Sequence, residues 1–186
     1  MSEVTTYFHD LIQLINLLPQ DRIQDVIDLL DRARYEGRSI FLFGNGGSAA
    51  TASHFACDLG KGTRAAGKPD FRVMAIGDGL PTLTAYGNDM GYDRVFAEPL
   101  GAWARPGDIA LGISGSGNSA NVLRAMETAR EKKLGTVGFI GFKGGKLKDL
   151  VDLSVIAESD DMGQIEDAHH ITQHAICAAL LKRAKV

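Results

Sequence analysis

The sequence predicts an α/β fold in which helices cover both faces of a five-stranded, mainly parallel sheet, forming a three-layer sandwich. Three observations predict it. Short apolar runs alternate with helical patterns along most of the chain. Two strand-to-helix turns, at 44–49 and 115–120, share the pattern G-x-G-x-S-A. Two further helical patterns precede the first apolar run, so they add to the α/β core.

The length of the chain suits one domain. A chain of 186 residues can bury a full hydrophobic core, and no low-complexity segment divides it. We therefore expect a single domain over 1–186, with an N-terminal helical pair at 1–37 and an α/β core at 38–186.

Composition excludes several classes of function. The net charge is -3, so no basic excess points to nucleic-acid binding. No apolar run reaches the roughly 18 residues of a membrane span, and the N-terminus reads as a charged helix rather than a signal peptide. We expect a cytoplasmic protein. Cys57 and Cys177 lie in helical patterns and are interpreted as small buried residues, with core packing preferred over a reactive thiol at Cys57.

The leading helices are expected at 2–18 and 20–35. Each has an apolar face; Pro19 ends the first helix and Gly37 stops the second. Apolar faces outside a sheet need a cover, so we expect an oligomer interface here. The alternative is that both helices cap one sheet face of a monomer.

The α/β pattern then follows in order. We expect strands at 39–43, 71–76, 109–113, 136–140 and 153–156. We expect helices at about 48–59, 80–86, 92–104, 120–133, 147–150 and 162–185.

Three connecting segments leave alternatives open. The loop 61–70 holds Lys61 and Arg64, interpreted as solvated rather than as anion contacts. The break at 87–91 places Asn88 and Asp89 either toward a pocket or in a bare Asx turn. Trp103 is expected as a core or interface anchor.

The loop 114–119, Ser-Gly-Ser-Gly-Asn-Ser, follows a strand and opens a helix. Three hydroxyls and several backbone N–H groups gather where a helix N-terminus carries partial positive charge. Such a turn binds an anion, most often phosphate, without a lysine or arginine. The alternative is a Gly/Ser turn with Ser119 as a plain N-cap, which needs only one of the three serines.

The first turn, Gly44-Asn45-Gly46-Gly47-Ser48, repeats this device. Both copies also match a dinucleotide fingerprint, which requires an acidic residue ending the next strand about 20 residues on. Asp70 precedes the next strand and Asp78 is too distant, and the second copy leads to Gly141 instead. We therefore favour phosphate over a dinucleotide.

Imidazoles and carboxylates recur four residues apart on two helices. His54 and Asp58 share one face, and Glu166, His170 and His174 form a stripe on the last helix. Converging from two helices, such groups bind a zinc-like ion or act as an acid–base pair. Taken separately, each set is explained by an ion pair or a polar helix face. His169 lies off the stripe and is expected to be exposed or structural.

Several of these blocks match a known family. They are the two leading helices, the 44–48 turn, the helix with His54, the 86–91 break, the Leu-Gly-Ile-Ser-Gly-Ser-Gly-Asn-Ser-Ala-Asn-Val block at 111–122 and the histidine-containing last helix. On these residues the chain resembles the sugar isomerase (SIS) domain, and more closely the phosphoheptose isomerases within it. The resemblance covers nearly the whole chain.

The resemblance implies a flavodoxin-like, five-stranded parallel sandwich that assembles as a homotetramer with sites between subunits. It implies aldose–ketose isomerisation of a sugar phosphate, sedoheptulose 7-phosphate above all, with zinc as cofactor. The substrate and its phosphate would be held by Asn45, Gly46, Ser48, Asn88, Asp89, Ser114, Gly115, Ser116 and Ser119. The metal would be held by His54, Asp58, Glu166 and His174. Asp58 and His174 would also be the acid–base pair.

The chain departs from the family pattern at four positions. Asp58 stands where glutamate is usual, and Glu166 where glutamine is usual. The extra carboxylate would hold a metal more tightly or push His174 toward its protonated form. Gly163 and Gly115 replace an aspartate and a threonine that are common in the family, which allows for a different sugar.

His170 stands where the family usually has an apolar residue, so we expect it outside the site.

Two other functions fit the resemblance. One is a non-catalytic SIS protein that binds a protein partner, as in the replication-initiator-associating type, and the other is a sugar-phosphate sensor. The paired histidine and carboxylate sets favour an enzyme, because a scaffold has no use for them.

Overall fold

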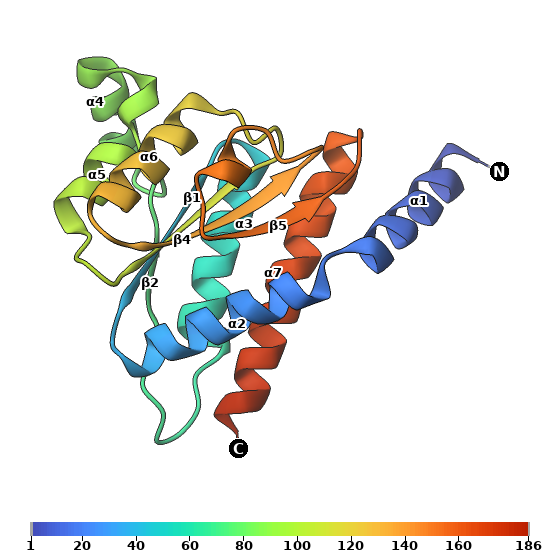
Figure 1. The fold of residues 1–186 in the computed structure, drawn as a ribbon, viewed down its shortest axis with the longest axis horizontal. Helices are drawn as coiled ribbons and strands as arrows, with labels where there is room; N and C mark the ends of the chain where they lie inside the picture. The colour runs from blue at the N-terminus through green and yellow to red at the C-terminus, as the bar shows by residue number, and fades with distance from the viewer. Residues whose placement is uncertain (1, 186) are drawn as a thin grey trace.

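One parallel sheet forms the centre of the molecule, and helices cover both of its faces (Figure 1). The computed structural model describes residues 2–185. In that range the sheet has five strands in the order β2-β1-β3-β4-β5. They are β1 (Ser39–Gly44), β2 (Arg72–Ala75), β3 (Ile109–Ser114), β4 (Gly135–Gly141) and β5 (Leu153–Ala157). All four pairings are parallel, which confirms the predicted three-layer fold and its flavodoxin-like strand order.

The seven α-helices of the described chain fall into two layers and one outlier. They are α1 (Glu3–Leu17), α2 (Gln20–Tyr35), α3 (Gly47–Cys57), α4 (Leu80–Met90), α5 (Ala97–Trp103), α6 (Ala120–Glu131) and α7 (Met162–Ala184). The side chains of α2, α3 and α7 enter one core, and those of α5 and α6 enter the other. None of the helices between residues 2 and 185 combines the length and the apolar character that crossing a bilayer requires.

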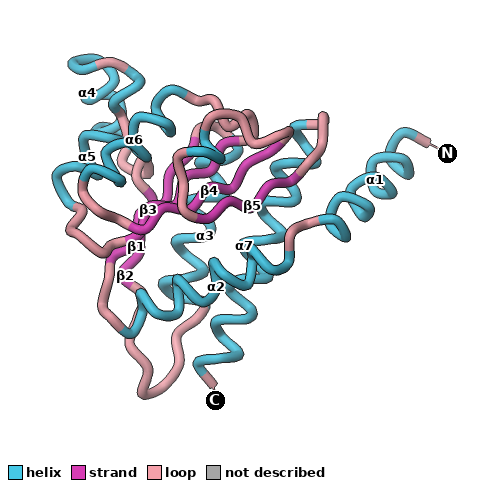
Figure 2. Tube along the Cα trace, viewed as in Figure 1, coloured by secondary structure: helices cyan, strands magenta, loops and turns pink. Residues whose placement is uncertain are grey.

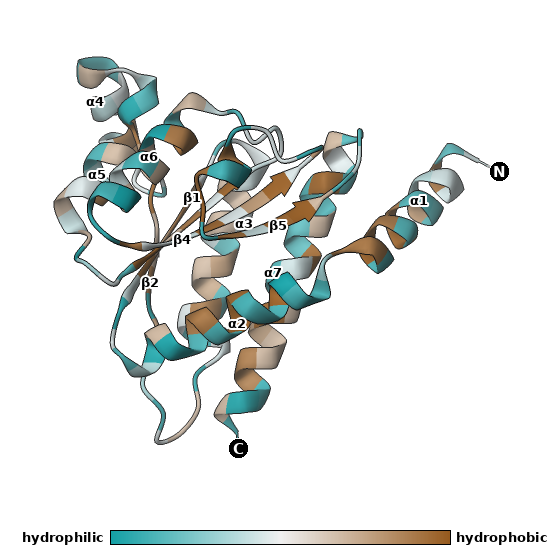
Figure 3. Cartoon of the chain, viewed as in Figure 1, coloured by the Kyte–Doolittle hydropathy of each residue, from teal (hydrophilic) through white to brown (hydrophobic). Residues whose placement is uncertain are grey.

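The strands are apolar because both faces of the sheet are covered. All six residues of β3 are buried, and β1 and β4 are buried beyond their first residue. Figure 3 shows this as brown strands between helices that carry teal, hydrophilic outer surfaces. Only β2, at one edge, alternates between exposed and half-buried residues.

The two leading helices behave differently. Val26, Ile27 and Leu30 bury α2 against the first core, so α2 caps a sheet face, which is what the alternative predicted for both helices. In contrast, α1 points away from the sheet and ends far from it (Figure 2). Leu14 is its one buried residue among those described.

The segment before β3 differs from the prediction. The break expected after Tyr86 is wrong, because α4 continues through Asn88 and Asp89 to Met90, and Gly91 ends it with a φ of +97°. The helix expected at 92–104 is a short 3-10 turn, Tyr92–Arg94, followed by α5. After α3, one π-helical turn, Asp58–Gly62, widens the helix.

The burial predicted for Cys57 is wrong, because Cys57 is exposed, while Cys177 is buried as expected. Trp103 is 54 % exposed, so it is not a core residue of the single chain, and its role as an interface anchor stays a prediction. Trp103 and Cys57 both line a hollow of about 520 Å³ beside β2, so they face this opening instead of the core. Burial raises the pKa of the Cys177 thiol to about 12, which leaves it without thiolate character near neutral pH.

The strand order places both glycine-serine turns at one point of the sheet. The chain leaves β1 toward β2 on one side and returns through β3 on the other, so β1 and β3 flank the place where the winding reverses. Gly44 at the end of β1 pairs with Ile113 on β3, one residue before the serine loop. Open α/β sheets bind ligands at this crevice, beyond the carboxyl ends of the strands.

Candidate functional site

The serine loop after β3 is held by backbone contacts. Gly117 N–H donates to Ser114 O at 3.0 Å, and Gly115 O accepts from Gly141 N–H at 2.9 Å. Gly117 has a φ of +63°, and a Cβ there would lie 2.7 Å from the carbonyl carbon of Gly144. The loop therefore packs against the turn after β4, and only glycine fits at 117.

The serine side chains are turned toward one another instead of closing the helix end. Ser114 Oγ lies 3.2 Å from Ser119 Oγ, and Ser116 Oγ accepts from Asn118 N–H at 3.2 Å. Within the part of the chain described, Ser119 makes no side-chain cap to the first turn of α6. The plain N-cap reading is therefore wrong. The helix N-terminus keeps backbone donors for another acceptor, which is the arrangement an anion site needs.

The first turn places Ser48 near the N-terminus of α3, where it is 6 % exposed. Gly46 just before it has a φ of +54°. A Cβ on Gly47 would lie 2.6 Å from Cδ of Glu166, so the Glu166 carboxylate lies directly against this turn. A carboxylate is favoured there by the partial positive charge of the helix end.

A pair of amides joins the two turns. Asn45 Nδ2 donates to Asn121 Oδ1, and Asn121 Nδ2 donates to Asn45 Oδ1, both at 2.8 Å. Tyr92 OH donates to the same Asn45 oxygen at 2.9 Å. Asn121 is 3 % exposed, so the pair is a buried link between α6 and the first turn. Of these three, the sequence singled out only Asn45. Asn121 stood inside the matched 111–122 block and was the signal available for it, whereas nothing in the pattern marked Tyr92.

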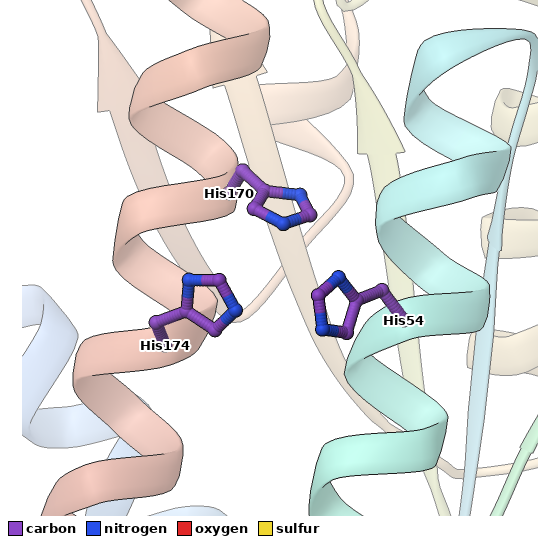
Figure 4. Close-up of side chains that lie close together, drawn as sticks. All are labelled: His54, His170 and His174. Carbon is purple, nitrogen blue, oxygen red and sulfur yellow. The ribbon is translucent and has the colours of Figure 1, made fainter.

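Three imidazoles meet between α3 and α7 (Figure 4). His54 on α3 faces His170 and His174 on α7, with ring centroids 4.7, 5.0 and 4.8 Å apart for the pairs 54–170, 54–174 and 170–174. One nitrogen from each ring lies within 4.8 Å of the other two. The i, i+4 spacing of His170 and His174 puts both on the face of α7 that looks at α3. We call these three residues the histidine cluster.

Asp58 completes the cluster from the π-helical turn after α3. Its Oδ2 lies 3.3 Å from His54 Nε2 and 3.5 Å from His174 Nε2. The side chain of Asp58 is 29 % exposed, and those of His54 and His174 are 42 % and 50 % exposed. The cluster therefore opens to solvent on one side, where a small molecule can reach it.

The pKa of His170 is lowered, first by burial and then by the neighbouring imidazoles of His174 and His54. The neutral imidazole is the form that offers a lone pair to a cation.

The structure divides the expected metal set. It brings His54, Asp58 and His174 together, but it places the Glu166 carboxylate at Gly47, outside the histidine cluster. The expectation that His170 lies outside is wrong, because its ring lies as close to His54 and to His174 as these two lie to each other. The prediction followed the family, which usually has an apolar residue at this position, and so it could not foresee what a histidine there would contact.

The remaining predicted residues lie apart from these features. Asn88 and Asp89 are exposed on α4, where Asn88 Nδ2 donates to Asp89 Oδ1 at 2.8 Å, and neither side chain forms a hydrogen bond with either turn among the described residues. Arg64 forms an exposed ion pair with Asp70 at 3.0 Å, which fits the solvated loop.

His169 is structural. Its ring is 2 % exposed and its Nε2 lies 3.1 Å from Ile140 O. Burial lowers its pKa to about 4.

Comparison with known proteins agrees with this geometry. The model of the SIS domain family matches residues 6–141. A curated phosphoheptose isomerase of Aliarcobacter butzleri is 44 % identical over 141 residues, which is 76 % of this chain and 74 % of the relative. A phosphoheptose isomerase of Geotalea daltonii is 33 % identical and covers 98 % of this chain and 96 % of its own. The solved structure of the phosphoheptose isomerase of Neisseria gonorrhoeae superimposes with a TM-score of 0.88 at 30 % identity, over 95 % of this chain and 96 % of that one.

Proposed function

Since this chain belongs to the SIS domain family and, within it, to the phosphoheptose isomerases, it is a phosphosugar isomerase, and we propose that it interconverts sedoheptulose 7-phosphate and D-glycero-D-manno-heptose 7-phosphate. The observation that carries the proposal is one arrangement. Two serine-bearing turns open side by side at the sheet's switch point, and the helix that begins at one of them carries His54 and leads into Asp58, beside His174 of α7. A phosphate site and an acid–base site are thereby joined by one element, α3.

The phosphate is assigned to the two turns. The hydroxyls of the serines and the free N–H groups of both helix ends are neutral donors for it. The proposed contacts are Asn45, Gly46, Ser48, Ser114, Gly115, Ser116 and Ser119. Asn88 and Asp89 are proposed as contacts of the sugar instead of the phosphate, since their side chains form no hydrogen bond with either turn in the described chain.

The proton transfer is assigned to Asp58 and His174. In the ketose-to-aldose direction, the Asp58 carboxylate takes a proton from C1 while His174 gives one to the carbonyl oxygen on C2, which yields an enediol. Asp58 then returns its proton to C2, and His174 takes the hydroxyl proton from the oxygen on C1, which becomes the aldehyde. Asp58 Oδ2 and His174 Nε2 are 3.5 Å apart, a separation that suits work on adjacent carbons.

A divalent ion, most simply Zn²⁺, is proposed at the same place. Imidazole nitrogens with a carboxylate are a donor set that Zn²⁺ prefers, and His54, His174 and Asp58 supply it from two helices. When bound, the ion would polarise the carbonyl and so make the C1 proton easier to remove.

A coupled assay with sedoheptulose 7-phosphate tests the proposal. The protein is stripped with a chelator and assayed before and after Zn²⁺ is restored. We expect turnover that falls on chelation and returns with the metal. Turnover that is indifferent to chelation removes the zinc part of the proposal, and absence of turnover with phosphate esters still bound points to another sugar phosphate.

We also propose that the chain assembles as a homotetramer in the cytoplasm with its sites at subunit interfaces. The exposed stripe of Val4, Phe8 and Ile12 on α1 supports this, because a second copy is the simplest cover for it. The open side of the histidine cluster is also suited to completion by a neighbouring subunit.

A further inference from the structure

His170 has a position in this chain that the family pattern does not foresee. Its ring forms close, steeply inclined pairs with His54 and His174, at interplanar angles of 62° and 86°. The three side chains converge from α3 and α7 on one point between the helices (Figure 4). Glu166, the acid expected in the metal set, lies one turn earlier on α7, about 6 Å along the helix axis.

The position of Glu166 separates it from that point. Its carboxylate is seated against Gly47, the first residue of α3, and His54 lies seven residues further along the same helix. Seven residues correspond to about 10 Å along the axis. The negative charge is also favoured where it is, at the positive end of α3. Recruitment of Glu166 to the cluster would require it to leave this place.

The histidine cluster needs a much smaller adjustment. In a tetrahedral site with zinc–nitrogen bonds of about 2.0–2.1 Å, ligand nitrogens stand roughly 3.4 Å apart. The three nitrogens here already lie within 4.8 Å of one another. Small rotations of the imidazole rings suffice to close that difference. Asp58, with Oδ2 next to two of the rings, supplies the carboxylate that metal-binding histidines commonly have beside them.

We propose that His170 is a metal ligand of this chain in place of Glu166, so that His54, His170 and His174 hold a zinc-like divalent ion beside Asp58. Three nitrogens and one oxygen favour Zn²⁺, Co²⁺ or Ni²⁺ over Mg²⁺ and Ca²⁺, which prefer oxygen. The inference rests on the metal part of the proposed function and not on the identity of the sugar.

Metal affinity in matched variants tests it. Chelator-stripped protein is titrated with Zn²⁺ against a coloured competing chelator, for the wild type, His170→Leu and Glu166→Gln. His9→Ala, which removes an exposed imidazole on α1, is the control. We expect His170→Leu to bind Zn²⁺ at least about 10-fold more weakly, and the other two variants to match the wild type. A loss of affinity in Glu166→Gln with none in His170→Leu overturns the proposal.

Two spectroscopic readouts are independent of catalysis. The visible bands of the Co²⁺-loaded protein should change in His170→Leu and stay unchanged in Glu166→Gln. X-ray absorption of the Zn²⁺-loaded wild type should count three imidazoles, which requires no variant and holds even if His170→Leu fails to fold. Two imidazoles or fewer would mean that His170 is not a ligand, and no binding of Zn²⁺ and Co²⁺ at all would mean that the rings form an aromatic cluster without a metal; either result overturns the proposal.

The assay with sedoheptulose 7-phosphate, run in parallel, keeps the two proposals apart. Zn²⁺ binding that depends on His170 without turnover of this sugar leaves the inference standing and removes the substrate. Turnover in a protein that binds neither ion removes the inference and keeps the substrate.

Discussion

Asp58 is the residue at which two roles meet. Its carboxylate lies beside His54 and His174 and is assigned the proton transfer. The family's usual glutamate is one methylene longer. The shorter aspartate side chain can reach the substrate only if its backbone lies closer to it. A displacement of about 1 Å at such a group can cost roughly 100-fold in rate, so we expect the π-helical turn that carries Asp58 to matter for the proposed proton transfer.

Neutralising that carboxylate should abolish most of the activity. We expect Asp58→Asn to lower kcat by about 10²–10⁴-fold, the usual contribution of a general base. Asp58→Glu keeps the charge and should retain far more activity than Asp58→Asn. Steady-state kinetics with the sugar phosphate measures both. Near-normal turnover in a folded Asp58→Asn protein would show that the proton is moved by another group.

Asn121 offers a prediction about the link between the turns. In Asn121→Ala the half-buried amide of Asn45 loses both of its partner's hydrogen bonds, and the free energy of unfolding should fall by about 1–3 kcal/mol. Binding of phosphate esters should weaken as well, because the two turns are no longer held in fixed positions relative to each other by the amide pair. Tyr92→Phe is the matched comparison: it removes one exposed hydroxyl from the same oxygen and should cost about 1 kcal/mol or less. Urea denaturation and ester titration measure the two effects. Equal stability losses in both variants would contradict the buried role of Asn121.

At the level of elements, the turns after β1 and β3 repeat one chemical pattern in two surroundings. Both contain a glycine with positive φ, Gly46 at +54° and Gly117 at +63°. The two glycines differ in the room that their surroundings leave for a side chain. Nothing lies within 4 Å of a Cβ on Gly46, whereas a Cβ on Gly117 would meet Gly144 and lie 2.9 Å from Ile140 Cγ2.

This difference predicts unequal costs for the same substitution. Gly46→Ala should cost only the backbone strain of a residue with a Cβ at φ +54° and ψ −122°, about 1–3 kcal/mol. Gly117→Ala should cost about 1–3 kcal/mol more, because the methyl group also forces the two loops apart. Thermal and urea unfolding of both variants measure the difference. If the two alanine variants are equally stable, the serine loop yields to the new methyl group and is not held by the turn after β4.

The features that the sequence predicted correctly are those set by neighbouring residues in the chain. The apolar runs of β1, β3 and β4 and the two glycine-serine turns are local features, and all appear where expected. The course of α4 was missed, because Gly87 and Asn88 signal a break in any short window and only Gly91, with its positive φ, ends the helix. Glu166 and His170 lie one turn apart on one face of α7, so periodicity could not tell which of them points at His54.

At the scale of the whole molecule, α1 is the element that bears on how copies of the chain assemble. The stripe of Val4, Phe8 and Ile12 is exposed in the single chain, and α1 is held mainly through Leu14 and the hydrogen bond from Tyr7 to Asp167 of 2.6 Å. Because these apolar residues at i, i+4 and i+8 form one face of a projecting helix, we expect a helix-to-helix contact between copies.

A charge on that stripe should separate the copies. We expect Phe8→Glu to shift the protein to a smaller species in analytical ultracentrifugation while the far-ultraviolet circular dichroism stays unchanged. Gln13→Glu adds the same charge at an exposed site off the stripe and should leave the assembly intact. A Phe8→Glu protein with the mass of the wild type would place the subunit contact elsewhere.

The layered sheet could be foreseen for the whole molecule because five alternating units permit few arrangements. The hollow beside β2 could not, since it depends on how α3, α4 and α5 stand around an edge strand. Trp103 and Cys57 look like core residues in the sequence, and only the packing of separate elements leaves them at an opening.

The junction at Leu18 and Pro19 has an evolutionary consequence. Because Pro19 begins α2 without an amide hydrogen, the chain bends there and α1 leaves the body at an angle set by few contacts. Substitutions at this elbow can re-aim the arm without disturbing the sheet, the turns or the histidine cluster. Evolutionary change at this elbow would therefore move a neighbouring copy relative to the open side of the histidine cluster, which we propose that copy completes, so that assembly and reaction would change together.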